Sequence, residues 1–147
     1  MTKFVSAIDL PANLDSFEKW QGEEPFEDHA GPFYMRADSE QGVHLSAFMP
    51  ENRHMNGGNA LHGGMLMAFA DYALFVIARD VTEGKPCVTV SCHTDFVRGA
   101  QPNEPVFAAG EVTRDSRSLI FVRGEIFTKT SGVLASFNGI LKRIGVN

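Results

Sequence analysis

The pattern of apolar and polar positions contains one long apolar segment in the middle of the chain. From Met65 to Ala78 every residue is apolar or aromatic except Asp71. A helix that is apolar on all sides is buried, whereas a surface helix has a polar face. The pattern therefore predicts a buried helix from Gly63 to about Val81, which is the one long helical candidate in the chain.

Strand-length segments rich in Val, Ile, Phe and Thr follow this helix, and the links between them are short. Short links favour an antiparallel meander over crossover connections. Before the helix we expect two short strands around a turn, and one buried helix with about six strands indicates an α+β fold whose single sheet curls around the helix. The later strands are predicted at 87–97, 105–113, 118–129 and 133–143, the earlier ones at 33–37 and 43–49 around a turn at 39–42, a leading helix at 13–20, and loops at 21–32 and 50–61.

Length and composition describe an ordinary globular chain. We expect a single domain over residues 1–147, with a helix-and-loop extension over 1–30. Apolar residues make up 44% and charged residues 21%, which excludes a disordered or fibrous chain. The formal net charge is −5 and no basic stretch occurs, so nucleic acid is not an expected partner.

Cysteine usage and the apolar segments bear on the compartment. Cys87 and Cys92 would lie on opposite faces of a regular strand, so no disulfide is expected between them. The N-terminus lacks the apolar run of a signal peptide. The apolar stretch from Met65 to Ala78 is shorter than the roughly 20 residues that a membrane span needs. We expect a soluble, cytoplasmic protein that does not enter the membrane.

Asp71 departs most clearly from its surroundings. Met67, Ala68, Leu74 and Phe75 lie one helical turn away on either side, so the carboxylate is not part of a polar face. A carboxylate in apolar surroundings is costly unless it is paired, hydrogen-bonded or used in chemistry. Two interpretations follow: a base or nucleophile in a reaction site, or a structural Asp that breaks the helix or caps a second one.

The triplet His62-Gly63-Gly64 opens the same helix. Two glycines in a first turn cost about 1 kcal/mol each relative to Ala, which makes sense if a ligand must approach the backbone closely. Free N–H groups at a helix N-terminus stabilise negative charge, such as that on a thioester oxygen during acyl transfer. The alternative is an ordinary glycine-rich loop ending, with His62 as a capping or packing residue.

Helix geometry separates these candidates. Gly63 and Asp71 are about 12 Å apart along the axis of a regular helix, and His62 and Asp71 lie about 180° apart around it. A base or nucleophile and an oxyanion donor must both come within about 3 Å of one reacting carbonyl. One copy of the helix cannot supply both. If both act, the site is therefore shared between two subunits of a symmetric dimer.

Other candidates are weaker. Asn56 could orient a water or a carbonyl, although Asn is also a standard turn residue. Thr89 alternates with Val88 and Val90, so it is expected to point away from the apolar side of its strand. No Cys, His or carboxylate spacing is typical of a metal site, and no serine-hydrolase or nucleotide-binding motif occurs. We expect no metal.

The spacing from Asn56 through His62-Gly63-Gly64 to Asp71 resembles the signature of hotdog-fold acyl-CoA thioesterases of the phenylacetic-acid-degradation (PaaI-like) type. These belong with the 4-hydroxybenzoyl-CoA thioesterases in one superfamily. The likeness extends over residues 33–144, because a long helix followed by four strands is the order of that fold. The segment 88–98 also looks like the family's strand after the helix, whereas the first 30 residues carry no resemblance.

The resemblance implies a hotdog fold and hydrolysis of an acyl- or aryl-CoA thioester to the free acid and CoA, with no cofactor beyond the CoA of the substrate. By position, Asp71 would be the base or nucleophile and the Gly63 N–H would polarise the thioester carbonyl. Asn56 would position the water or the carbonyl, His62 would shape that loop, and Thr89 would help to hold the water.

Relatives of this type are usually homodimers or dimers of dimers, in which Asn56 and Gly63 would face Asp71 and Thr89 of the neighbouring subunit. Two other functions stay open: a hotdog hydratase or dehydratase, which would need an acid–base pair such as His62 with Asp71, and a non-catalytic acyl-CoA-binding module. The cost of keeping a carboxylate in an apolar helix favours catalysis. Two arginines could meet the CoA phosphates or could be solvated surface residues: Arg98 and Arg117. Five apolar residues could line an acyl pocket or could simply form the core: Met65, Met67, Phe69, Phe75 and Phe96.

Overall fold

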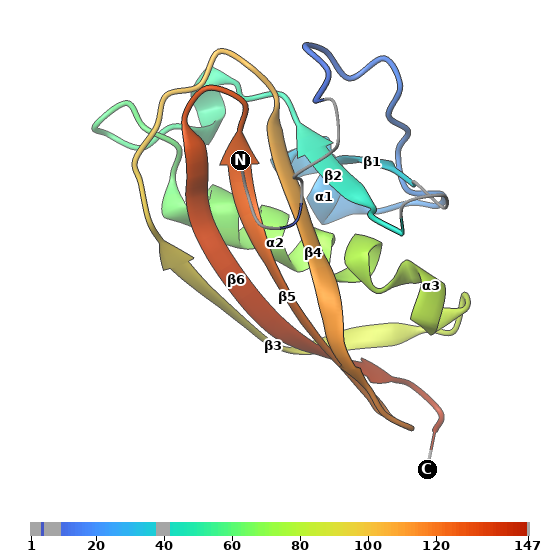
Figure 1. The fold of residues 1–147 in the computed structure, drawn as a ribbon. Coiled ribbons are helices and arrows are strands. Elements are labelled where there is room, and N and C mark those ends of the chain that lie inside the picture. Colours follow the sequence, from blue (N-terminus) through green and yellow to red (C-terminus); the bar gives the residue numbers. More distant parts are fainter. Residues whose placement is uncertain (1–3, 5–9, 38–41, 147) are drawn as a thin grey trace.

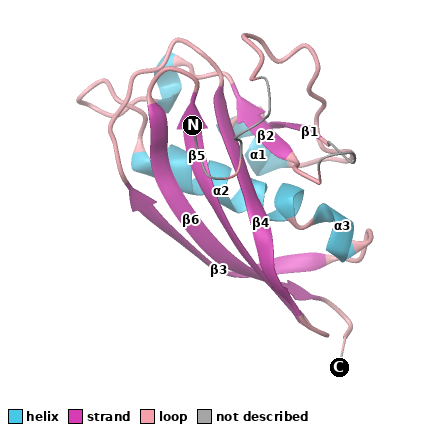
Figure 2. Ribbon diagram, in the orientation of Figure 1, coloured by secondary structure: helices cyan, strands magenta, loops and turns pink. Residues whose placement is uncertain are grey.

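The structure is an antiparallel sheet with one long helix against it. The computed structural model describes residues 4, 10–37 and 42–146, and within them six strands form one sheet in the order β1-β2-β4-β5-β6-β3. Figure 1 shows α2 lying across one face of this sheet, and Figure 2 marks helices and strands by colour. The predicted α+β class is confirmed. The strands are β1 (Tyr34–Arg36), β2 (Leu45–Phe48), β3 (Cys87–Phe96), β4 (Val106–Asp115), β5 (Leu119–Thr128) and β6 (Gly132–Arg143), and the helices are α1 (Pro25–Ala30), α2 (Gly63–Ile77) and α3 (Arg79–Thr82), with a 3₁₀ turn at Asn52–His54.

The strand order departs from a simple meander. β4, β5 and β6 pair in sequence, as predicted, whereas β3 pairs with β6 rather than with β4. The reason is the link between β3 and β4, residues 97–105, which is longer than the usual two to five or so residues of a hairpin and passes over the end of the sheet (Figure 1). Along this path Leu61 N–H donates to Ala100 O at 2.8 Å, so the link is tied to the loop before α2. The strand that follows the central helix is therefore an edge strand.

Helix α2 approaches the sheet closely because glycines lie under it. A Cβ atom on Gly139 of β6 would lie 2.4 Å from Leu74 Cδ1, and one on Gly110 of β4 would lie 2.8 Å from Ile77 Cδ1. Cβ atoms do not come this close to other heavy atoms, so a larger residue at either position would force these helix side chains or the neighbouring strand backbone, at Ser91 O or Arg123 O, to move. The helix side chains that face the sheet, such as Phe69 and Leu74, are fully buried.

The helix is not buried on all sides, which corrects the prediction from its apolar pattern. Met67 is 46% exposed, and it belongs to a stripe at helical spacing that the sheet leaves uncovered. The helix also ends at Ile77, because the backbone at Ala78 leaves the helical conformation, so the segment predicted to reach Val81 as one helix is divided into α2 and α3. The uncovered stripe consists of Gly64, Met67, Asp71 and Phe75.

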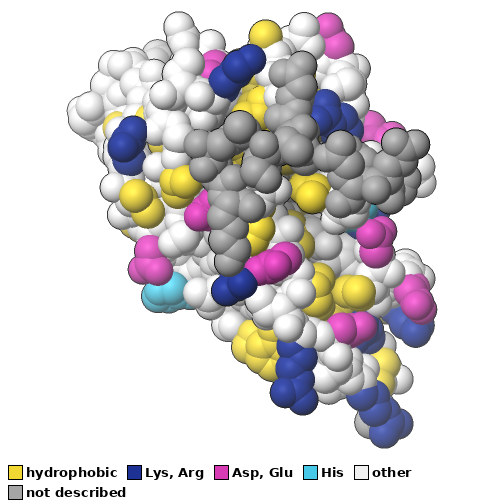
Figure 3. Space-filling view, in the orientation of Figure 1, with side chains coloured by type: hydrophobic (Ala, Val, Ile, Leu, Met, Phe, Trp, Pro, Cys, Tyr) yellow, Lys and Arg dark blue, Asp and Glu magenta, His cyan; other side chains and the backbone are white. Residues whose placement is uncertain are grey.

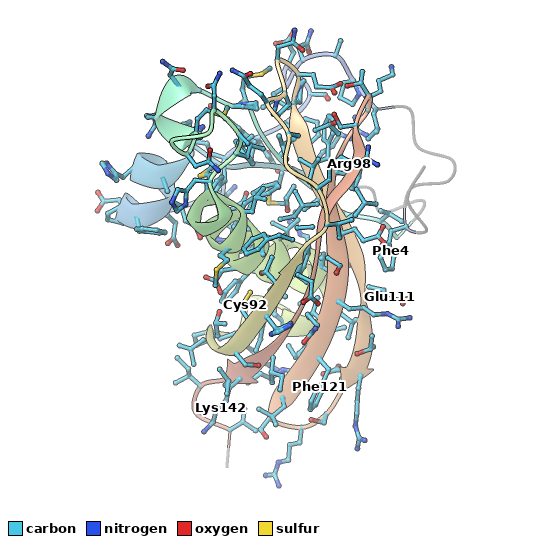
Figure 4. The ribbon with its side chains drawn as sticks, turned by 90° about the vertical axis from the view of Figure 1, so that its left-hand side faces the viewer. Phe4, Cys92, Arg98, Glu111, Phe121 and Lys142 are labelled. Carbon is cyan, nitrogen blue, oxygen red and sulfur yellow. The ribbon has the colours of Figure 1, made fainter. Side chains whose placement is uncertain are left out.

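Several residues of strand β3 face α2 that in a regular strand would lie on opposite faces of the sheet. Its register against β6 shifts between Thr89 and Ser91, which marks a β-bulge at Val90. As a result Cys87, Thr89 and Cys92 all lie on the helix side and are half-buried. Figure 4 shows Cys92 between β3 and α2. The prediction that the two cysteines lie on opposite faces is wrong, although both are free thiols, as expected.

The N-terminal residues differ most from the prediction. Residues 13–16 form bends and a turn rather than a helix, and the Asn13 side chain accepts a hydrogen bond from Asp15 N–H. Glu18 pairs instead with Met35 of β1 in an isolated antiparallel bridge. The helix lies instead at α1, within the segment predicted to be a loop, because Pro25 stands in its first turn, where a proline is tolerated. Most of the turn predicted at 39–42 lies outside the described residues.

The outer face of the sheet, away from α2, carries a second apolar cluster. Leu10, Leu14 and Phe17 pack there against buried side chains of β2, β4 and β5. Figure 3 shows basic, acidic and apolar side chains interspersed on the visible face, with no uniform basic patch. Among the helices in the described part of the chain, none combines the length and apolar character needed to cross a membrane.

Helix α1 brings a carboxyl group against α2. Glu27 is half-buried, and burial raises the pKa of its carboxyl to about 7, with the carboxylates of Glu24, Asp71 and Asp28 adding to the shift. An acid whose pKa is raised on folding keeps a proton that the unfolded chain has lost. Its contribution to stability is therefore full below the ordinary glutamate pKa of 4.5 and is lost as the pH rises through about 7.

Replacing Gly139 should loosen the contact between helix and sheet. We expect Gly139→Ala to lower the free energy of unfolding by about 2–3 kcal/mol, because the new methyl group would overlap Leu74 and the carbonyl oxygen of Ser91. The control is Gly57→Ala, whose Cβ would meet nothing within 4 Å and should change the free energy by less than about 0.5 kcal/mol. Chemical denaturation measures both variants. Equal unfolding free energies for Gly139→Ala and Gly57→Ala would show that Gly139 does not set the helix position.

The raised pKa of Glu27 predicts a pH-dependent effect on stability. Relative to the wild type, Glu27→Gln should gain about 1 kcal/mol in unfolding free energy between about pH 5 and pH 8, after allowance for the partial exposure of the side chain. Denaturation curves at both pH values measure the gain. The control is Glu23→Gln, on an exposed side chain of the same segment. The same gain in both variants would contradict its assignment to Glu27.

Candidate active site

The side chains of Asp71 and Thr89 meet between α2 and β3. The Thr89 hydroxyl donates a hydrogen bond of 2.6 Å to Asp71 Oδ1, and both residues are half-buried. The expectation that Thr89 points away from the core is therefore wrong: Val88 and Val90 are the exposed residues, at 45% and 57%. Asp71 Oδ2 has no hydrogen-bond donor among the described residues. Nor do these residues contain a cluster of three or more His, Cys, Asp or Glu side chains that could hold a metal ion.

His62 caps the start of α2. Its Nδ1 accepts a hydrogen bond of 2.8 Å from Gly64 N–H, which requires this nitrogen to be unprotonated. The contact satisfies one of the N–H groups that every helix leaves free in its first turn, in agreement with the capping interpretation. The N–H of Gly63, one residue earlier, meets no acceptor in the described part of the chain. It is therefore available to a negative or polarised oxygen.

Asn56 holds the loop that leads into the helix. Its Oδ1 accepts hydrogen bonds from Gly58 N–H at 2.9 Å and from Ala60 N–H at 3.1 Å. The side-chain oxygen is thus occupied by a turn, as the alternative interpretation of this residue has it. The side-chain nitrogen of Asn56, Nδ2, has no acceptor among the described residues, so this is the atom of the side chain that can meet a ligand.

A buried histidine that the sequence did not indicate supports the same loop. His54 Nδ1 accepts from Glu51 N–H at 3.0 Å, and Nε2 lies 2.8 Å from Ala30 O, to which it donates. The carbonyl of His54 in turn accepts from His62 N–H at 2.9 Å. No motif could single out this residue, because its partners are backbone atoms and one of them, Ala30 O, comes from a segment that only the fold brings near.

A cavity of about 320 Å³ adjoins the first turn of α2. Asn56, Gly63 and Arg98 all line it, so the fold brings these three predicted residues together. Phe96 lines it as well, and its ring would lie 3.0 Å from a Cβ atom on Gly63, which gives a packing reason for this glycine. The Arg98 guanidinium donates to Ser131 O at 2.6 Å, a contact that anchors the side chain.

Arg117 lies elsewhere in the molecule. It is exposed in the turn between β4 and β5, at the end of the sheet where Leu119 pairs with Lys142. Figure 4 shows Lys142 and Arg98 toward opposite ends of the sheet. Within one chain, therefore, Arg98 and Arg117 cannot contact the same phosphate group.

A larger cavity, of about 450 Å³, adjoins the part of α2 just beyond Asp71, at Tyr72 and Phe75. Its wall includes Phe75, which is one turn beyond Asp71 on α2, and the rings of Trp20 and Tyr72, which pack edge to face at 6.3 Å. Of the apolar residues considered for a pocket, Phe75 lines this cavity and Phe96 the smaller one. The sequence did not indicate Trp20 or Tyr72, because one lies in the N-terminal segment and the other in the apolar run of α2.

Solved structures of other proteins share this architecture. The PaaI protein of the Escherichia coli phenylacetic acid degradation operon matches with a TM-score of 0.71 and 22% identity, over 84% of this chain and 87% of that one. A variant of the phenylacetic acid degradation protein PaaI from Thermus thermophilus matches with a TM-score of 0.69 and 26% identity, over 82% of this chain and 100% of that one.

Sequence comparison agrees with the fold. A Pseudomonas aeruginosa protein named as an esterase is 34% identical over 73 residues, which are 49% of this chain and 54% of the relative. The match thus spans about half the length of this curated relative. The pattern of the thioesterase superfamily matches residues 58–135, more than half of the chain, and this segment includes Gly63, Asp71 and Thr89. The fold is a hotdog fold, and the chain belongs to the thioesterase superfamily.

Proposed function

We propose that the protein hydrolyses acyl- or aryl-CoA thioesters in a site shared between two subunits. The oxygen of water adds to the thioester carbonyl carbon, the carbon–sulfur bond breaks, and the products are the free acid and the CoA thiol. The observation that carries this proposal is the Asp71 carboxylate, which the Thr89 hydroxyl holds at 2.6 Å on the uncovered stripe of α2. A carboxylate held in this way acts as the base that takes a proton from water or as the nucleophile that first attacks the carbonyl.

The second group that this reaction needs is a donor to the carbonyl oxygen. The Gly63 N–H at the start of α2 fits this role, since no described residue accepts its hydrogen and the positive end of the helix dipole lies there. Gly63 and Asp71 are about 12 Å apart along the same helix. The two groups can therefore act on one carbonyl only if they come from different subunits.

Strand β3 offers a geometry that brings them together. Along β3, Thr89 contacts Asp71, and Phe96 packs on Gly63. Antiparallel pairing of two copies of β3 about a twofold axis midway between Thr89 and Phe96 would place Phe96 of the partner subunit opposite Thr89. Gly63 of the partner subunit would then face Asp71, and the symmetric operation would build a second, identical site.

The surface along β3 supports a second copy of the chain as its occupant. β3 is an edge strand, and an unpaired edge with exposed apolar side chains is a ready site for strand pairing. Pairing would satisfy its free backbone groups and would cover the stripe of α2 beside it. We propose a homodimer on this basis, and a dimer of dimers as the larger assembly. The exposed apolar residues of this surface are Met67, Val88, Val90, Phe96 and Val97, each between 45% and 60% exposed.

The smaller cavity would then receive the CoA end of the substrate. Arg98 lines it together with Asn56 and Gly63, and a guanidinium binds phosphate well. A role of Arg117 toward CoA, the absence of a separate cofactor and a cytoplasmic location stay predictions. A hydratase is less well supported, because the Nδ1 atom of His62 is engaged with Gly64 N–H in its own helix.

Asp71→Asn should lower kcat for acyl-CoA hydrolysis by about 10²-fold or more, because an amide neither takes up the proton nor attacks the carbonyl. Release of free thiol from a panel of short, long and aryl acyl-CoAs measures the loss. The control is Asp15→Asn, which removes the same charge from an exposed position and should keep wild-type rates. If the wild type releases no thiol from any thioester yet binds acyl-CoA, the protein is a binding module and the hydrolase proposal fails.

Gly63→Pro removes the proposed oxyanion donor with little change to the helix. Proline is tolerated at the first helical position, and His62 before it is extended (φ −65°, ψ 135°), as a residue before proline should be. We expect kcat to fall by about 10²-fold. Gly63→Ala keeps the N–H but adds a similar contact with Phe96, so it separates loss of the donor from crowding.

Coexpression of Gly63→Pro chains with Asp71→Asn chains, each carrying one substitution, tests whether the site is shared. Coexpressed subunits that pair at random give about half mixed dimers, and each mixed dimer holds one intact site, so about a quarter of wild-type activity should return. Recovery requires Asp71 and Gly63 to act from different chains. If both groups act within one chain, every site contains a defect and the mixture stays as inactive as its components.

A further inference from the structure

The larger cavity is built partly by residues that precede the family match. Trp20, Glu24 and Glu27 of the N-terminal segment face Tyr72 and Phe75 of α2 across a space of about 450 Å³. The superfamily pattern begins only at residue 58. These wall residues therefore lie outside the segment that the superfamily pattern matches.

The position of the cavity makes it the natural place for the acyl group. Phe75 is four residues beyond Asp71, about 6 Å along the helix axis. Cys87 also lines the cavity and lies two residues before Thr89 on the same side of β3, about 6–7 Å along the strand. Both elements thus lead from the Asp71–Thr89 contact into the cavity. A thioester whose carbonyl lies at Asp71 can extend its acyl group there.

One of the residues that line the cavity, Tyr72, has a buried hydroxyl that lacks a partner. Tyr72 is only 2% exposed, and its hydroxyl makes no hydrogen bond with any described residue. Burial raises the pKa of Tyr72, so the hydroxyl stays neutral near pH 7. A buried hydroxyl without a partner is costly, and Tyr72 is one of the residues that line a cavity large enough to hold a ligand group.

The charge on the same wall is negative. Glu27 and Glu24 line the cavity, and Asp71 is near enough to contribute to the raised pKa of Glu27. Lys85 is the cation on the wall, but it is exposed and pairs with Glu83 at 3.4 Å. The rings of Trp20, Tyr72 and Phe75 complete a lining of carboxylates and aromatic faces, and both kinds of group bind cations.

Resting on the proposed hydrolysis, we infer that the preferred substrates are thioesters whose acyl group ends in a protonated amine, which the Glu27 carboxylate and the Tyr72 hydroxyl bind. An ammonium group donates hydrogen bonds to both oxygens at once. A purely apolar acyl group would leave the buried Tyr72 hydroxyl and the half-buried Glu27 carboxylate without partners, and an acyl group that ends in a carboxylate would be repelled by Glu27 and Glu24.

Three thioesters of nearly equal shape test this inference: 4-(aminomethyl)benzoyl-CoA, 4-(hydroxymethyl)benzoyl-CoA and 4-ethylbenzoyl-CoA. We expect kcat/KM for the aminomethyl compound to exceed that for the ethyl compound about tenfold or more. Equal values for the two, or a preference for the hydroxymethyl compound over the aminomethyl one, would overturn the inference while leaving the hydrolase proposal intact.

Matched variants locate the preference. Glu27→Gln should bring the ratio of the aminomethyl to the ethyl compound close to one, whereas Glu23→Gln, an exposed change in the same segment, should keep the wild-type ratio. Tyr72→Phe should lower the ratio by a smaller factor. An unchanged ratio in Glu27→Gln would show that this carboxylate does not bind the amine.

Binding provides a readout that does not depend on turnover. The shift in melting temperature caused by each of the three thioesters can be measured with Asp71→Asn, in which hydrolysis should be slow. The aminomethyl compound should stabilise the protein most, and Glu27→Gln in that background should remove the difference. If no thioester is hydrolysed by the wild type but this order of stabilisation holds, the proposed hydrolysis fails and the specificity of the cavity stands. Equal shifts for all three overturn the specificity.

Discussion

The close approach of α2 to the sheet is the constraint on which the rest of the structure depends. Gly110 and Gly139 leave no side chain between strand and helix, so Leu74 and Ile77 rest directly on the sheet. This contact fixes both the depth and the rotation of the helix. Asp71 therefore faces β3, where a single hydroxyl meets its carboxylate at 2.6 Å. A helix seated one methyl group farther out would lose this contact, and with it the fixed orientation of the carboxylate.

The same rigid helix keeps the Gly63 N–H and the Asp71 carboxylate apart. Its first turn offers an N–H group, and its middle offers a carboxylate about 12 Å away. A folded subunit with both groups in place is still, in the proposed mechanism, two halves of different sites. Activity then belongs to the pair of chains, so conditions that weaken association lower activity before they unfold the subunit. The exposed edge of β3 and the uncovered stripe of α2 are, in this view, one surface left open for the same purpose.

Much of this architecture could be predicted because its signals are local. The apolar run of α2 and the alternating strands have the periods of their elements, and Asp71 stands out as the single carboxylate in that run. What failed depends on contacts between distant segments. The uncovered face of α2 and the place of β3 beside β6 are set by the whole sheet. The side of β3 on which Thr89 lies is set by a bulge in its pairing with β6. The cavity wall of Trp20 and Tyr72 likewise exists only once the N-terminal segment has packed on α2.

Because of the bulge at Val90, the exact number of residues in β3 decides which of its side chains face α2. Cys87 and Thr89 before it, and Cys92 after it, share the inner face only because one extra residue lies between them. Deleting one residue at this point would make the strand regular and turn one of these two groups outward. Over evolutionary time β3 should therefore accept exchanges of side chains far more readily than insertions or deletions. The link at 97–105 lies outside any strand and carries no such count, and its constraint is instead to keep Arg98 at the smaller cavity and the Ala100 carbonyl on Leu61 N–H.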